Sequence, residues 1–303
     1  MITLGSDPEF MLRDPEGELR SAIGIIRGTK DERLDLGDGN AIYYDNVLAE
    51  CNIRPGNSPE AAVANFRECF ERFAEHVAPH KLVVQASAHY PEGECEHDDA
   101  KVFGCEPEFC AYTVCMIEPP ICEDTFRSAG GHIHIGYDGG VDGPEEEEEL
   151  NFQIAWNRIW VVRMADLLLG IPSLFLDKDP TSKERRKLYG GAGSHRSCAD
   201  WGVEYRTLGN FWLAKPSLVS LVYDLSDRCV QLVLDEHVHE KIWDDEIDPN
   251  DLCKTINTWD EEGAKKYMKV LKRYVPEALF AQIKREIDSP ESGDLYQEWE
   301  IKP

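Results

Sequence analysis

Two short segments of the sequence alternate polar side chains with spacer residues and are bounded by glycine. They are GHIHIG at residues 131–136 and GVEYR at residues 202–206. Successive side chains of a β-strand point to opposite faces, so His132 and His134 would share one face of the first strand. Glu204 and Arg206 would share a face of the second strand in the same way. Side chains of these types bind metals and phosphates, so both segments predict strands that line a binding surface.

A third segment adds two carboxylates near the start of the chain. It reads GSDPEF at residues 5–10, in which Asp7 and Glu9 would share a strand face. Hard cations such as Mg²⁺ prefer carboxylate oxygens, tolerate an imidazole and commonly bridge the protein to substrate phosphates. We expect the three strands to converge on one concave surface that binds ATP with two such ions, Mg²⁺ or Mn²⁺. The expected metal ligands are Asp7, Glu9, Glu50, His132 and Glu204.

Glu50 belongs to a further strand-like segment, residues 41–53, in which it shares a face with Asn52. Asp45 would need a β-bulge to join that face, so it is not among the expected ligands. Each element also has an ordinary explanation, namely a surface acidic pair, a structural HxH strand, or a same-face ion pair on the GVEYR strand. Their occurrence together on several glycine-flanked strands favours a site.

Basic and glycine-rich residues are concentrated between positions 183 and 196 of an otherwise acidic chain. Arginine side chains and glycine-rich backbone are natural partners of phosphoryl oxygens. The residues expected to bind the nucleotide are Lys183, Arg185, Arg186 and Tyr189, with Arg196 at the end of the segment. A flexible basic surface loop is the alternative interpretation, and the adjacent GVEYR strand makes it less attractive.

The charge balance restricts the partners of this protein. The sequence has 32 Lys and Arg against 58 Asp and Glu, a net charge of −26, which disfavours duplex nucleic acid and anionic membranes. Its most apolar segment, residues 151–171, is interrupted by Arg158, Arg163 and Asp166, so we expect no membrane span. The ten cysteines contain no CxxC pair and no signal segment precedes them, which favours reduced thiols and a cytoplasmic location.

The order of apolar patterns predicts an α+β fold with a largely antiparallel sheet. Strands are expected at residues 2–13, 18–26, 41–53, 81–90, 126–137 and 202–210, with loops at 27–40 and 177–198. Helices are expected at 59–77, from 144 to about 170, from 216 onward, and as two or three shorter helices in 249–288. We expect a catalytic domain at 1–240 and a helical extension at 241–303 that packs on the same domain.

Taken in order, these motifs resemble a known superfamily. The series GSDPEF, Glu50, GGHIHIG, the basic glycine segment and GVEYR resembles the carboxylate-amine ligases related to glutamine synthetase and glutamate-cysteine ligase. The closest likeness is to the phage-type COOH-NH2 ligases, type 2. It covers roughly residues 1–213, and the C-terminal 60 residues add little to it. A second G-x-acid-P-E-F pattern, residues 104–109, belongs to the same likeness and has no assigned chemical role.

The resemblance implies a curved antiparallel sheet that forms a funnel of the glutamine synthetase type. It implies that Asp7, although one carbon shorter than the Glu common there, serves one metal with His132 and Glu204. Glu9 and Glu50 would hold the other metal. His134 would face the substrate or nucleotide, and Arg196 and Arg206 would stabilise the transferred phosphoryl group.

The implied reaction is ATP-dependent amide formation between a small carboxylate, such as glutamate or a peptide end, and an amine. The carboxylate would first form an acyl phosphate. Two alternatives stay open: a phosphotransferase on the same scaffold, and a catalytically silent binding or virion-associated protein. A location in the cytoplasm of an infected host cell is a further expectation from the resemblance. A homo-oligomer is also expected, with the C-terminal helices as candidates for its contact.

Overall fold

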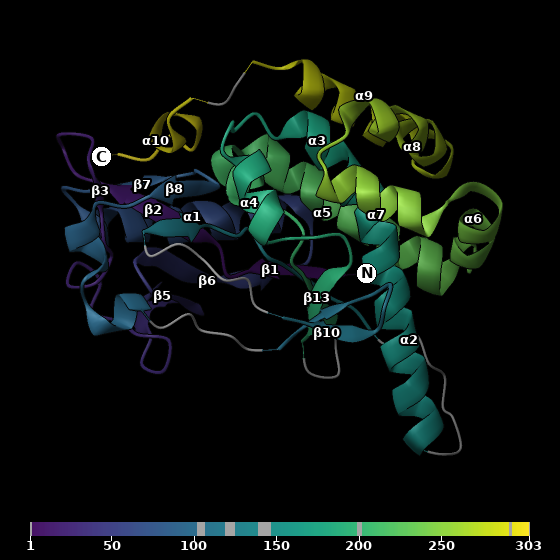
Figure 1. Cartoon of the computed structure of the whole chain (residues 1–303), viewed down its shortest axis with the longest axis horizontal. Coiled ribbons are helices and arrows are strands. Elements are labelled where there is room, and N and C mark those ends of the chain that lie inside the picture. Colours follow the sequence, from purple (N-terminus) through teal and green to yellow (C-terminus); the bar gives the residue numbers. More distant parts are fainter. Residues whose placement is uncertain are drawn as a thin grey trace.

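A computed structural model describes residues 2–101, 107–118, 125–138, 147–198, 202–290 and 293–302. It shows a mixed α+β protein in which a large sheet is covered by helices (Figure 1). All pairs of neighbouring strands within the described sheets are antiparallel. The predicted α+β class with a largely antiparallel sheet is therefore confirmed, and the funnel shape stays an expectation.

The large sheet has twelve strands among the described residues, and its main path runs β10-β9-β13-β14-β12-β1-β6-β2-β3. Its strands are β1 (Thr3–Ser6), β2 (Glu9–Arg13), β3 (Leu19–Arg20), β4 (Leu34–Gly37), β5 (Asn40–Asp45), β6 (Leu48–Gly56), β7 (Lys81–Val83), β9 (Glu108–Cys110), β10 (Cys115–Ile117), β12 (Ile133–Gly136), β13 (Ser194–Ser197) and β14 (Gly202–Tyr205). Strand β5 pairs with β4 and β6, and β7 pairs with β2. A separate pair contains β8 (Ser87–His89) and β11 (Phe126–Ser128).

Four helices are interleaved with the strands, and the described chain after β14 is mainly helical. They are α1 (Pro59–Val77), α2 (Glu147–Ala165), α3 (Ile171–Leu176), α4 (Ser182–Leu188), α5 (Pro216–Val230), α6 (His239–Glu246), α7 (Pro249–Asn257), α8 (Glu261–Tyr274), α9 (Glu277–Asp288) and α10 (Leu295–Glu298). Short 3₁₀ turns lie at Glu92–Cys95, Asp98–Lys101 and Asn210–Ala214, and π-helical turns at Asp166–Gly170 and Gln231–Asp235.

Helix α1 begins and packs as its sequence predicts. Ser58 caps it by accepting a hydrogen bond from the backbone N–H of Ala61, and proline occupies its first turn. Its stripe of Phe66, Cys69, Phe70 and Phe73 is fully buried. Phe10 of β2 meets Phe70 edge to face, with ring centroids 5.3 Å apart. This apolar contact holds α1 against the sheet.

The central apolar helix is longer than predicted. Its expected end at residues 170–172 is wrong, because a π-helical turn carries the chain from α2 directly into α3. Pro172 lies in the first turn of α3, directly after the π-helical turn. The run Glu149–Leu176 is long and apolar enough to cross a membrane, but 89% of its most apolar window is buried inside the protein. The start expected at Pro144 lies outside the described residues.

Several predicted strands are interrupted. The strand expected at 2–13 divides at Pro8, which has no N–H for a ladder, and the one at 41–53 is a β5–β6 hairpin. Asn46 sits in its turn with a positive φ of 56°, which asparagine tolerates better than most residues. The strands expected at 81–90 and 126–137 are each two strands, and the one at 202–210 ends at Tyr205.

Two expected loops and one expected strand also need correction. The segment 177–198 was expected to be a loop, but it contains α4 and β13. Its basic character was misleading, because Arg185 and Arg186 of α4 are buried. The segment 27–40 contains β4, and the strand expected at 18–26 is reduced to the two residues of β3.

The C-terminal helices share a hydrophobic core with the sheet-bearing part of the chain. Trp299 is fully buried, and its ring lies 5.1 Å from Phe70 of α1. The phenol of Tyr296 accepts a 3.1 Å hydrogen bond from the backbone N–H of Leu82 in β7. Figure 1 accordingly shows α10 beside the N-terminal strands. The division into domains at residue 240 stays a prediction.

Candidate active site

Strand register brings the predicted polar side chains into one row. His134 of β12 lies directly opposite Glu204 of β14, which in turn lies opposite Arg196 of β13. Directly opposite residues on antiparallel strands point to the same face, so these three side chains share a surface. Strand β1 pairs with the other edge of β12, and Asp7 follows the end of β1. The row therefore crosses four strands that come from three separate regions of the sequence.

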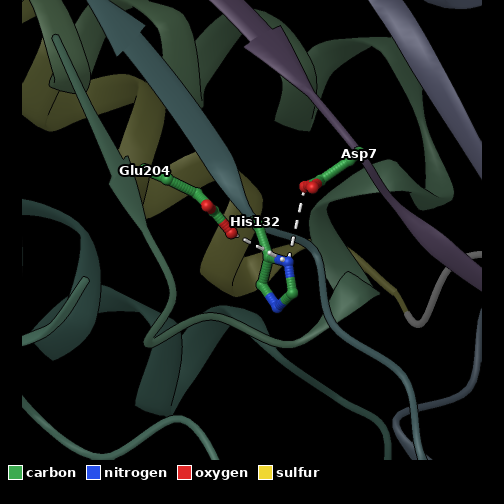
Figure 2. A group of neighbouring side chains, drawn as sticks. All are labelled: Asp7, His132 and Glu204. Atoms are coloured by element: carbon green, nitrogen blue, oxygen red, sulfur yellow. Dashed lines mark ion pairs between the residues drawn. The ribbon is translucent and has the colours of Figure 1, made fainter. Parts of the chain in front are cut away.

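Asp7, His132 and Glu204 form the first group of potential metal ligands, whose ligand atoms lie within 4.8 Å of one another. The Nδ1 atom of His132 lies 3.4 Å from Asp7 Oδ1 and 3.3 Å from Glu204 Oε1 (Figure 2). Figure 2 shows both carboxylates on the Nδ1 side of the imidazole ring. His134 reaches the same Asp7 oxygen through Nε2 at 3.2 Å. The two histidines therefore share a face, as their spacing predicts.

Burial and mutual charge perturb this first group. Burial would raise the pKa of Asp7, but His134 and His132 hold it well below its usual value. Burial and the neighbouring Arg206 lower the pKa of His132 to about 3, so its ring is neutral at pH 7. Burial and the nearby Asp7 raise the pKa of Glu204 to about 8. A neutral imidazole beside crowded carboxylates is a suitable environment for a cation.

Glu9, Asp45 and Glu50 form the second group, again with ligand atoms within 4.8 Å. Glu9 of β2 lies opposite Glu50 of β6, and Glu50 accepts a 2.6 Å hydrogen bond from the phenol of Tyr43 in β5. The backbone N–H of Gly130 donates a 2.6 Å hydrogen bond to Glu9 Oε2. Burial and Asp45 raise the pKa of Glu9 to about 7, and burial with Asp7 and Glu9 raises that of Glu50 well above its usual range.

The prediction that Asp45 needs a β-bulge to join Glu50 is wrong. It treated Asp45 and Glu50 as members of one strand, but they lie on the two arms of a hairpin. Tyr43 is opposite Glu50, and Asp45 is two residues from Tyr43 on the same strand. All three side chains therefore point to one face, and no bulge is needed.

The donor sets fit hard divalent cations. Each group offers mainly carboxylate oxygens, the ligands that Mg²⁺ and Mn²⁺ prefer, and the first adds an imidazole. Glu50 Oε2, Asn52 Oδ1 and His132 Nε2 are buried and have no hydrogen-bond partner among the described residues. All three residues line one cavity, so a bound ligand could supply the partners that these buried polar atoms lack.

Arg206 connects the first group to the wall of the site. Its guanidinium forms an ion pair with Glu204 through one terminal nitrogen, which also lies 3.1 Å from His132 Nδ1. The other terminal nitrogen donates to the phenol of Tyr189. Tyr189 also lies against His132, with ring centroids 6.2 Å apart. Arg206 and Tyr189 are therefore both brought to the site.

The remaining basic residues divide into two sets. Arg186 and Arg196 line the same cavity as the two acidic groups, whereas Arg185 does not. The buried guanidinium of Arg185 donates to the backbone carbonyls of Ala129, at 3.0 Å, and Thr207, at 3.3 Å. Lys183 also lies outside the cavity, with its ammonium 3.6 Å from Glu261. The structure thus does not bring these two predicted nucleotide ligands, Arg185 and Lys183, to the site.

Both acidic groups open into one cavity of about 700 Å³, a size suited to small-molecule ligands. Its positively charged lining residues are Lys30, Arg33, Arg127, Arg186, Lys187, Arg196 and Arg206. Gly190 and Gly191 also line it. Gly190 has a φ of +72°, and a Cβ there would lie 2.3 Å from Arg185, so this close turn requires glycine.

Comparison with known protein families shows which family this chain belongs to. A family model described as phage phiEco32-like COOH.NH2 ligase-type 2 matches residues 125–301, more than half of the sequence. The chain belongs to this family. No curated protein is significantly similar to it. The family name denotes ligases that join a carboxyl group to an amine, in agreement with the resemblance seen in the motifs.

The matched range differs from the range expected for this ligase family. It includes His132, His134, Glu204 and Arg206, but it begins after the acidic residues of the N-terminal strands. It also extends to residue 301, so the expectation that the C-terminal 60 residues add little to the likeness is wrong. The C-terminal helices belong to the region that defines the family, in keeping with their share of the core.

Glu108 is absent from the residues predicted for the site, although its motif is repeated in the sequence. Glu108 of β9 is nearly buried, lines the cavity and lies 3.5 Å from the Nε atom of Arg206. Residues 104–109 match the pattern of residues 5–10, in which Glu9 occupies the corresponding position. Glu9 also lines the cavity. The one signal available in the sequence was therefore this six-residue repeat, whose residues 104–106 lie outside the described chain.

Proposed function

We propose that this protein is an ATP- and divalent-cation-dependent ligase that joins a carboxylate to an amine through an acyl phosphate. The observation that carries the proposal is the convergence of two groups of cation ligands in one cavity with basic walls. The family description supplies the carboxyl and amine groups. ATP is the reactant that can convert a stable carboxylate into one that an amine can attack.

The proposed ligands divide between two cations. Asp7, His132 and Glu204 would hold one, and Glu9, Asp45 and Glu50 the other. When bound, the cations would neutralise phosphate charge and polarise the transferred phosphoryl group. Asn52 Oδ1 lines the cavity near Glu50 and offers a further oxygen.

Several residues of the chain would position the reactants. Arg196 and Arg206 present guanidinium groups beside the first ligand group, where they would stabilise negative charge on the phosphoryl oxygens. His134 lies at the cavity surface next to Asp7, within reach of substrate or nucleotide. Arg186 and Tyr189 line the wall formed by the end of α4, and we assign this wall to the nucleotide.

The proposed chemistry needs no side-chain nucleophile. A carboxylate oxygen attacks the γ-phosphorus of ATP, and the bond to the departing ADP oxygen breaks. The amine nitrogen then attacks the acyl carbon, inorganic phosphate leaves with the electrons of the cleaved bond, and the nitrogen loses a proton. The cavity residues contribute by orienting the two substrates and balancing charge.

The decisive experiment combines product mass with a chemical trap. The protein is incubated with ATP, Mg²⁺ and a panel of amino acids, peptides and polyamines, and products are followed by mass spectrometry and phosphate release. Hydroxylamine replaces the amine in a parallel series, because it converts an acyl phosphate to a stable hydroxamate. Amide and hydroxamate formation that both depend on ATP are expected for the active carboxylate.

Matched variants connect the activity to the site. Glu9→Gln and Glu204→Gln each remove a ligand charge with little change of shape and should abolish turnover. Glu75→Gln makes the same chemical change on the exposed surface of α1 and should leave turnover unchanged. Full activity in both site variants would contradict the ligand assignment. A stable phosphorylated product without amide or hydroxamate would identify a phosphotransferase, and no binding of ATP with metal would identify a silent protein.

A further inference from the structure

Arg206 interacts with the same ligand atoms that the first cation would need. One of its terminal nitrogens forms an ion pair with Glu204 Oε1 and lies 3.1 Å from His132 Nδ1. These two atoms belong to the compact ligand group with Asp7, since His132 Nδ1 is 3.3 Å from that same Glu204 oxygen. The guanidinium therefore already interacts with two of the three proposed ligands of the first cation.

A guanidinium and a divalent cation cannot both bind Glu204 Oε1 and His132 Nδ1. A guanidinium and a divalent cation bound to the same ligand atoms would repel each other strongly, because the cation carries two positive charges and the site is shielded from water. The Nδ1 lone pair of His132 also cannot serve an arginine N–H and a cation together. Arg206 must therefore release Glu204 and His132 when the site is loaded.

The structure supplies a second carboxylate for Arg206. Glu108 Oε2 lies 3.5 Å from Arg206 Nε, a different nitrogen of the guanidinium from the terminal one that pairs with Glu204. Arg206 Nε is buried and makes no hydrogen bond to any described residue, so this contact has room to shorten. Glu108 itself is nearly buried, and a guanidinium that moves toward it would stay paired.

The position of Glu108 in the sheet suits this role. Phe109 of β9 is opposite His195 of β13, so their neighbours Glu108 and Arg196 point together to the other face of the sheet. That face also carries Glu204, which is opposite Arg196. Glu108 therefore extends the row of site residues by one strand beyond Arg196.

We propose that Glu108 is a positioning residue for Arg206, and that it receives the guanidinium when a divalent cation displaces it from Glu204 and His132. This inference rests on the proposed cation site. The displaced Arg206 remains in the cavity, held by Glu108 and Tyr189, where its positive charge faces the phosphoryl group instead of a metal ligand. The repeated sequence motif thereby contributes a ligand, Glu9, and a support for the arginine, Glu108.

The proposal makes opposite predictions for two variants. Mg²⁺ or Mn²⁺ binding is measured by calorimetry without nucleotide, so the readout does not depend on turnover. Arg206→Met removes the competitor and should tighten cation binding, whereas Glu108→Gln leaves Arg206 on Glu204 and should weaken it. We expect each change to be about tenfold, as is typical for residues that support metal ligands.

A double-mutant cycle separates this mechanism from simple loss of charge. If Glu108 acts through Arg206, Glu108→Gln should have little effect on cation affinity in the Arg206→Met background. Glu118→Gln serves as the charge control, since Glu118 lines the cavity too and should have the same small effect in both backgrounds. Glu108→Asp, which keeps the carboxylate, should restore part of the affinity. Circular dichroism confirms that each variant is folded.

Two kinds of result distinguish a wrong role for Glu108 from a wrong cation site. An equal effect of Glu108→Gln in both backgrounds, or tighter cation binding in that variant, would overturn the role of Glu108 and leave the proposed ligase function standing. Failure of the unmodified protein to bind either cation, even with ATP present, would overturn both the inference and the metal dependence of the proposed function.

Discussion

The phenol of Tyr43 donates a 2.6 Å hydrogen bond to Glu50 Oε1 from the position directly opposite on the neighbouring strand. This bond fixes one oxygen of the carboxylate, while Oε2 has no hydrogen-bond partner among the described residues. Orientation of a ligand by such a partner commonly changes metal affinity by about 10–100-fold. Tyr43 is therefore expected to determine how well Glu50 binds a cation.

Tyr43→Phe should weaken the binding of one of two cations by about tenfold, because Glu50 loses the bond that orients it. Calorimetric titration with Mn²⁺ measures the change. Tyr44→Phe is the matched control, since its phenol bonds Asp99 and its side chain points to the other face of β5. Equal affinities in all three proteins would show that the Tyr43 bond has no part in cation binding.

Glu50→Gln should raise the stability of the metal-free protein at pH 8. Burial and the negative charges of Asp7, Glu9 and Asp45 raise the pKa of Glu50 and oppose its ionisation. The amide keeps an acceptor for Tyr43 and removes a buried charge, so we expect a gain on the order of 1–3 kcal/mol. Urea denaturation in the presence of a chelator measures it.

The same variant should respond less to metal. A cation that binds only the folded state stabilises it by an amount set by its concentration relative to Kd. Addition of Mg²⁺ should therefore raise the Tm of the unmodified protein more than that of Glu50→Gln. Glu75→Gln should behave like the unmodified protein. A larger Mg²⁺-induced shift in Glu50→Gln would contradict the placement of a cation at Glu50.

The alternation of polar residues predicted much of the site, because the period of a strand is a local property. His132 with His134 and Glu204 with Arg206 share faces, as their spacing of two requires. Asp45 could not be placed in this way, since its relation to Glu50 depends on a chain reversal at Asn46. When two residues lie on different arms of a hairpin, their spacing in the sequence does not predict whether they share a face of the sheet.

The basic segment shows a second feature that the sequence could not predict, namely which of its side chains line the cavity. Lys183, Arg185 and Arg186 are all basic, so each was expected to bind the nucleotide. Their side chains point in different directions from α4. Arg186 lines the cavity, Arg185 holds buried carbonyl groups and Lys183 lies near Glu261. Successive residues of a helix differ by about 100°, so a segment predicted to be a loop gives no basis for choosing among them.

Asp166 should make stability depend on pH. Burial raises its pKa to about 6, although it accepts hydrogen bonds from Tyr205, at 2.7 Å, and Tyr112, at 2.9 Å. Because the folded state binds this proton more tightly, the contribution is fully present below the unfolded pKa near 4 and is lost as pH rises through 6. The difference between a pKa near 4 in the unfolded chain and about 6 in the folded protein corresponds to roughly 2–3 kcal/mol.

Comparison with Asp166→Asn isolates this contribution. The amide does not titrate, so the unmodified protein should gain on the order of 2 kcal/mol relative to the variant between pH 7.5 and pH 4.5. Urea denaturation at several pH values measures the difference in the free energy of unfolding. A difference that stays constant across this range would show that Asp166 titrates alike in the folded and unfolded states.

Trp299 should couple the C-terminal segment to the stability of the whole protein. Its ring is fully buried against Phe70, its indole N–H donates a 2.8 Å hydrogen bond to the carbonyl of Leu213, and Arg67 lies 5.8 Å from the ring centre. Trp299→Ala removes these contacts and leaves a cavity between α1 and the chain end. We expect a loss of about 3–5 kcal/mol.

The shape of the unfolding transition then tells whether residues 241–303 form a separate unit. Because Trp299 contacts α1 directly, the variant should unfold in one transition at lower denaturant concentration, with the sheet and the C-terminal helices melting together. Phe152→Ala removes another aromatic ring, but one that is 68% exposed on α2, and should change stability by less than about 0.5 kcal/mol. Two separate transitions in the Trp299 variant, with the sheet unaffected, would instead support an independent domain boundary near residue 240, because loss of the contact would then destabilise only the C-terminal helices.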